Sequence, residues 1–131
     1  MASCLLACHQ SGTWSEDPGN FRRAWGVEPP AGVFVVHSWY TRSPHFTREE
    51  IYYFELRADA SYARAFAEEN HMTPTRSGPT LELPFMEPRP SWFAPKPLAG
   101  YEIWRAAPDG PPALVLWDAG TGSVFIHVAQ L

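Results

Sequence analysis

The stretch Val33–Leu56, VFVVHSWYTRSPHFTREEIYYFEL, decides the fold that this sequence predicts. It contains two runs of β-branched and aromatic residues, Val33–Tyr40 and Glu50–Leu56, separated by a polar loop that contains Pro44. Such residues favour strands, and a breaker between two strands favours a turn. The stretch therefore predicts a long antiparallel β-hairpin. Because both faces of the first run are largely apolar, we expect a central strand that is covered on both sides.

The C-terminal third predicts a meander of three further strands, Tyr101–Ala106, Ala113–Asp118 and Val124–Leu131. The two connections between them contain the Gly, Asp and Pro residues that tight turns require. Together with the hairpin, these segments predict a five-stranded antiparallel sheet.

One segment, Asp59–Asn70 (DASYARAFAEEN), has the periodicity of a helix. Asp59 is suited to cap its first turn, because its carboxylate can accept a backbone N–H. Tyr62 and Phe66 lie one turn apart and predict the edge of the helix that is buried against the sheet. Asn70 is expected to end the helix in a left-handed conformation.

The segment Met72–Leu98 contains seven of the fourteen prolines. We expect an extended, polyproline-like band that lies across the face of the sheet opposite the helix. Its centre, Trp92-Phe93, favours docking inside the molecule over display as a ligand for another domain. The predicted fold class is therefore α+β, with a five-stranded antiparallel sheet, one helix on one face and the proline-rich segment on the other.

The length of 131 residues predicts one domain. Residues 1–30 read as an N-terminal tether or irregular segment, within which Asn20–Trp25 can form one helical turn. Residues 31–131 are expected to form the single α+β domain.

Composition and motifs narrow the functional classes. A net charge of −4 argues against nucleic-acid binding, which depends on Lys and Arg at phosphates. The sequence contains no GxSxG elbow, P-loop, HExxH or dinucleotide fingerprint, and the histidines match no zinc spacing. We therefore expect a binding domain rather than an enzyme, without a cofactor or metal.

The hairpin loop is the densest polar cluster and the best candidate for a ligand site. Arg42, His45 and Arg48 stand close together there and could hold a carboxylate or phosphate. Trp92 is an aromatic candidate for the same binding function, since Trp often anchors binding surfaces. The alternative is that the loop is a solvated hairpin end whose charges pair with Glu49 and Glu50.

The N-terminal residues Leu5-Leu6-Ala7-Cys8 resemble the lipobox of bacterial lipoproteins. The resemblance covers four residues and implies that Cys8 is lipidated and anchors the chain to a membrane. A signal peptide also needs a basic and an apolar region before the lipobox, so this interpretation expects a start upstream of Met1. The alternative is an ordinary apolar N-terminal segment.

These observations lead to one expectation and one rival. We expect a non-enzymatic binding domain of a bacterial cell-envelope lipoprotein, similar to small lipoproteins that act as inhibitors or immunity factors, with a protein as its partner. The rival is a small enzyme, or a receptor for a small anionic ligand, that uses the Arg42–Arg48 loop. Without the lipid anchor, a cytoplasmic location is the alternative.

Overall fold

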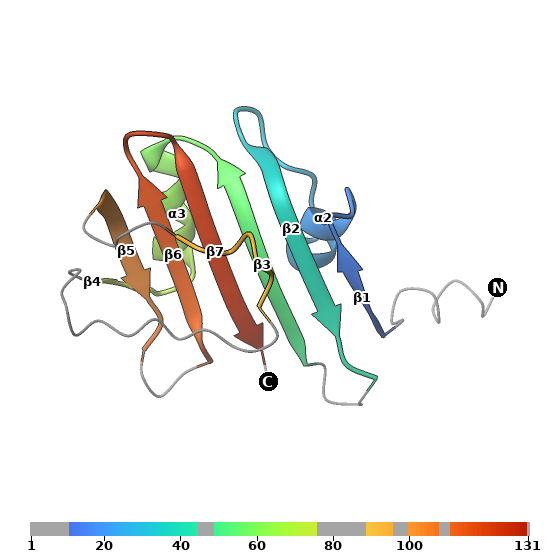
Figure 1. The fold of residues 1–131 in the computed structure, drawn as a ribbon. Helices are drawn as coiled ribbons and strands as arrows, with labels where there is room; N and C mark the ends of the chain where they lie inside the picture. The colour runs from blue at the N-terminus through green and yellow to red at the C-terminus, as the bar shows by residue number, and fades with distance from the viewer. Residues whose placement is uncertain (1–10, 45–48, 76–88, 96–99, 108–110, 131) are drawn as a thin grey trace.

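The computed structural model describes residues 11–44, 49–75, 89–95, 100–107 and 111–130. The strands are β1 (Gly12–Ser15), β2 (Phe34–Arg42), β3 (Glu50–Arg57), β4 (Thr73–Thr75), β5 (Tyr101–Arg105), β6 (Ala113–Asp118) and β7 (Ser123–Gln130), and the helices are α2 (Asn20–Trp25) and α3 (Ala60–Glu69). All seven strands belong to one antiparallel sheet with the order β1-β2-β3-β7-β6-β5-β4 (Figure 1).

The prediction of a five-stranded sheet with one helix is wrong. The five predicted strands are present as β2, β3, β5, β6 and β7, but β1 and β4 add one strand at each edge. These two strands have four and three residues, which is too short for an alternating pattern to show in the sequence. Within residues 1–30, which are expected to form an N-terminal tether or irregular segment, the structure contains the strand β1, and the helical turn expected over Asn20–Trp25 is confirmed as α2.

The predicted hairpin is confirmed and forms one side of the sheet. β2 pairs with β3 so that Trp39 lies opposite Tyr53 and Tyr40 opposite Tyr52. The register shifts between Val35 and His37, so that Val36 forms a β-bulge. β3 then pairs along its whole length with β7, which joins the hairpin to the C-terminal meander.

Both helices pack on the same face of the sheet, behind it in Figure 1. Phe21 and Trp25 of α2 meet Phe54 edge-on or tilted, and Trp25 also contacts Phe66 of α3. The buried residues of this core are Phe21, Val33, Tyr40, Tyr52, Phe54, Leu56, Ala63, Phe66, Ala67, Met72, Trp104, Val115, Val124, Ile126 and Val128.

The second face of the sheet is covered by residues 89–95, which cross in front of it in Figure 1. Phe93 is fully buried and meets Tyr53 and Phe125 edge-on, with ring centroids 4.8 and 5.4 Å apart. The predicted internal docking of this part of the proline-rich segment is therefore confirmed. The other buried residues of this core are Tyr53, Ile103, Leu114, Leu116 and Phe125.

Helix α3 shows how far capping rules predict its ends. Asp59 caps the helix as expected, since its Oδ1 accepts the backbone N–H of Tyr62 at 3.1 Å. Phe66 is buried as predicted, whereas Tyr62 is only partly buried at the margin of the core. Asn70 is not left-handed, because its φ is −96°; the residue with positive φ is His71, one position later.

Candidate functional site

Three consecutive apolar residues at the start of β2 are exposed. Phe34, Val35 and Val36 have exposed fractions of 67%, 39% and 40%. The expectation that this run is covered on both sides is therefore wrong for its first half. Single exposed apolar residues are ordinary, but a contiguous group on one strand marks a candidate interaction surface.

The edge of β2 beside these residues carries no strand in the part of the chain that the structure describes. β1 pairs only with the second half of β2, from Trp39 to Arg42. In Figure 1, β1 runs beside the lower part of β2 and leaves its upper part open. The unpaired edge therefore coincides with the exposed apolar side chains.

Glu16 ends the pairing between β1 and β2. It adopts a left-handed backbone conformation with φ of 57°, which turns the chain away from the sheet. Its N–H donates to the Ser38 carbonyl at 2.8 Å, and its Oε1 accepts the N–H of Ser38 at 2.9 Å. The Glu16 carboxylate thus accepts the Ser38 N–H in place of a backbone carbonyl of β1, and the edge of β2 that precedes Ser38 is left open.

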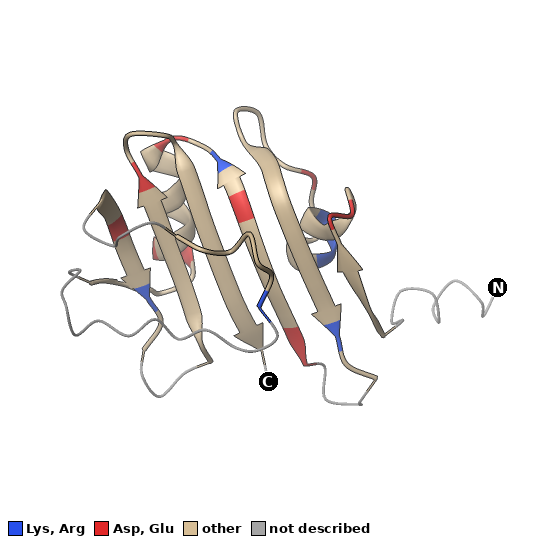
Figure 2. Ribbon diagram, in the orientation of Figure 1, with Lys and Arg blue, Asp and Glu red and all other residues tan. Residues whose placement is uncertain are grey.

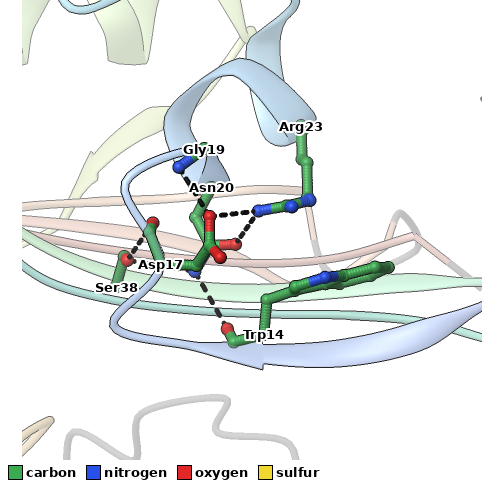
Figure 3. A network of polar contacts seen from close by, with 6 residues as sticks. All are labelled: Trp14, Asp17, Gly19, Asn20, Arg23 and Ser38. Carbon is green, nitrogen blue, oxygen red and sulfur yellow. Dashed lines mark hydrogen bonds and ion pairs between the residues drawn. The ribbon is translucent and has the colours of Figure 1, made fainter.

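A buried polar network holds β1, α2 and β2 together behind this edge, and Figure 3 shows it. Asn20, which is fully buried, donates from Nδ2 to the Trp14 carbonyl at 2.9 Å and to Ser38 Oγ at 3.0 Å. Its Oδ1 accepts from Arg23 at 3.0 Å. Because buried polar groups without partners are costly, this network fixes the relative positions of the three elements.

Asp17 extends the network towards the surface. Its Oδ1 accepts from Arg23 and from the Gly19 N–H, each at 2.7 Å. These hydrogen bonds, with Arg23 first, lower the pKa of Asp17 from its ordinary value. The Arg23 guanidinium also lies 4.4 Å from the centre of the Trp14 ring, so that one arginine of α2 contacts both β1 and the connection between β1 and α2.

A groove of about 470 Å³ runs beside the open half of β2. Its lining includes the apolar side chains at the start of β2, and the Asp and Glu residues in it are not accompanied by Lys or Arg. Figure 2 shows acidic residues on both connections that flank α2, beside the start of β2. The lining consists of Glu16, Asp17, Pro18, Glu28, Pro29 and residues 33–38.

His37 belongs to the lining of the groove and contacts Trp92, which packs on the second face of the sheet. His37 Nδ1 lies 2.7 Å from Glu16 Oε2, and its ring stacks on the Trp92 indole at 5.0 Å with an interplanar angle of 17°. The predicted site residue Trp92 is therefore beside the open edge. Since Glu16 contacts both His37 and Ser38, it orients His37 as well as ending β1.

Arg42 lies at the opposite end of β2 and is engaged within the hairpin. Its guanidinium donates to Tyr40 Oη at 3.0 and 3.3 Å and lies 3.4 Å from Glu50 Oε1. Both charged side chains are mostly buried, which favours the alternative in which these charges pair within the hairpin end. The other predicted site residues, His45, Arg48 and Cys8, lie outside the described residues.

A larger concavity of about 670 Å³ lies over β4 and β5. Its charged residues, Arg64 and Glu102, pair with each other at 2.6 Å. Arg64 holds Glu102 through two hydrogen bonds, 2.6 and 3.2 Å long, so both side chains are engaged, and the open edge of β2 remains the better candidate site.

Comparisons with protein families, with curated proteins and with solved structures give no significant match to this chain. Within the described ranges, no helix is long and apolar enough to cross a membrane.

Proposed function

We propose that this chain is a non-enzymatic binding domain that takes up an extended segment of a partner protein along the open edge of β2. One observation carries the proposal: Phe34, Val35 and Val36 are exposed where the edge of β2 is unpaired. An unpaired edge presents backbone N–H and C=O groups to another strand, and the neighbouring side chains supply apolar contact.

The framework behind the edge suits such a function. The Asn20 network ties β1 and α2 to β2, so the edge is held before a partner arrives. A preorganised surface binds more tightly than a mobile one, because less conformational freedom is lost on binding. On the second face of the sheet, the Trp92 ring stacks on the His37 ring and so holds His37 in place at the edge of β2.

The rival function, recognition of an anion by the Arg42–Arg48 loop, has less support. The Arg42 guanidinium already donates to Tyr40 Oη and pairs with the Glu50 carboxylate. A carboxylate or phosphate ligand would have to draw Arg42 away from both residues. That exchange would leave the largely buried Glu50 without this cation, which is unfavourable.

The cellular setting of the domain remains part of the proposal. The lipobox-like Leu5-Leu6-Ala7-Cys8 supports attachment of the chain to a bacterial cell envelope through Cys8. An anchored binding domain of this kind would meet its partner at the membrane surface.

Panning of a displayed library of random peptides on the folded domain tests the proposed function. We expect selected peptides whose affinity falls by about tenfold or more in Phe34→Lys, because the charge breaks the apolar strip. Val27→Lys is the matched control, since Val27 is 59% exposed but lies outside the groove. Failure to select any peptide, or an equal loss in both variants, would contradict the proposal.

A further inference from the structure

Acidic side chains line the groove beside the open edge of β2. We infer that the partner segment is basic, with Lys or Arg residues flanking the apolar residues that lie on Phe34–Val36. This inference rests on the proposed function and adds the chemical class of the partner.

The three charged residues in the lining of the groove are Glu16, Asp17 and Glu28, and Lys and Arg are absent from that lining. Asp17 pairs with Arg23 at 2.7 Å and Glu28 with Arg22 at 3.6 Å, and both arginines belong to α2. Glu16 pairs only with a histidine, His37, among the ion pairs of the described residues. The groove therefore presents carboxylates, whereas the guanidinium groups lie on its α2 side.

Glu28 is the carboxylate that is best placed to select a basic partner. Its side chain and that of Arg22 have exposed fractions of 69% and 71%, so their ion pair is weak and easily exchanged. A Lys or Arg of an added strand could take the place of Arg22 at little cost. Charges at the rim of an interface act mainly on partner choice and on the rate of association.

The same features disfavour a second copy of this chain as the occupant. Pairing of two β2 edges would bring the carboxylates of both copies into one groove, where like charges repel. A basic strand of a different protein does not meet this repulsion at the charged rim.

Peptides from the panning experiment test the inference. We expect selected sequences to be enriched in Lys and Arg at the flanks of an apolar core, relative to the unselected library. Affinity should weaken as sodium chloride rises from about 20 to about 500 mM, because salt screens exposed charges. Replacement of the flanking basic residues by Glu should weaken binding more than replacement by Gln.

Two variants with the same change of charge test whether Glu28 attracts the basic residues of the peptide. Glu28→Lys should weaken the selected peptides by about two- to fivefold at low salt. Glu68→Lys makes the same change of charge on the exposed face of α3, outside the groove, and should have no such effect. Ultracentrifugation of the free domain should show a monomer.

Two results would overturn the inference. If the selected peptides bind at Phe34 but are neither enriched in Lys and Arg nor weakened by salt, the inferred preference for a basic partner is wrong. The proposed function would still hold. If the free domain forms a dimer and Phe34→Lys dissociates it, the partner at the open edge of β2 is instead a second copy of this chain. If panning selects no peptide, the proposed function itself fails.

Discussion

His127 makes the stability of the second core depend on pH. Its side chain is fully buried and stacks on the ring of Tyr53 at 4.1 Å with an interplanar angle of 10°. Phe93 lies 6.4 Å away in an edge-on arrangement. Nδ1 lies 3.2 Å from the Tyr52 carbonyl oxygen, and because a carbonyl can only accept, this nitrogen carries the proton.

Burial lowers the pKa of His127 from 6.5 to about 4, since the charged imidazolium loses its hydration. Between these two values the unfolded chain binds more protons than the folded one, so the free energy of unfolding rises with pH. The stability due to the neutral ring is present above pH 6.5 and is lost as pH falls towards 4. The difference corresponds to about 3 kcal/mol.

Urea unfolding, followed by tryptophan fluorescence between about pH 7 and about pH 4, measures this loss. His127→Phe keeps an aromatic ring against Tyr53 but cannot titrate. The wild type should therefore lose about 3 kcal/mol more than this variant across the range. Asp17 and Asp59, whose pKa values are lowered mainly by hydrogen bonds, affect both proteins alike. Parallel pH profiles would refute the assignment of a buried, neutral histidine.

Three further predictions concern the core, the polar network and the anchor. Phe66→Ala should lower the free energy of unfolding by about 3–5 kcal/mol in urea titrations, and a loss below about 1 kcal/mol would contradict tight packing of α3. Asn20→Ala should cost about 1–3 kcal/mol, because the Trp14 carbonyl and Ser38 Oγ lose their donor, and an unchanged midpoint would contradict the network. Cys8→Ser, expressed with the upstream codons, should move the protein from the membrane fraction to the soluble fraction, whereas a soluble, unmodified wild type by mass spectrometry would contradict the lipid anchor.

The strands that the sequence predicts are those with enough residues to show a pattern. The hairpin and the meander contain runs of β-branched and aromatic residues, and each run is a strand in the structure. β1 and β4 read as GTWS and TPT, and their strand state comes from pairing with Trp39–Arg42 and Ile103–Arg105. Such pairing depends on partners distant in the sequence, which local preferences do not encode.

The candidate site was harder to predict than the fold. Of the candidate residues, Trp92 lies beside the open edge, whereas Arg42 is engaged with Tyr40 and Glu50. The sequence predicts that the apolar residues Phe34–Val36 are buried, because an apolar run on both faces is typical of a central strand. Their exposure follows from the point at which Glu16 turns β1 away from β2.

Amide chemical shifts test the central claim most directly. A peptide selected by panning is titrated into the isotope-labelled domain, and the shift of every backbone amide is followed. Addition of a strand to the open edge predicts the largest changes over residues 33–38 and at Glu16, because these residues form or flank that edge. Changes centred on the Arg42 end of the hairpin, or on the helical face around Tyr62, would contradict it.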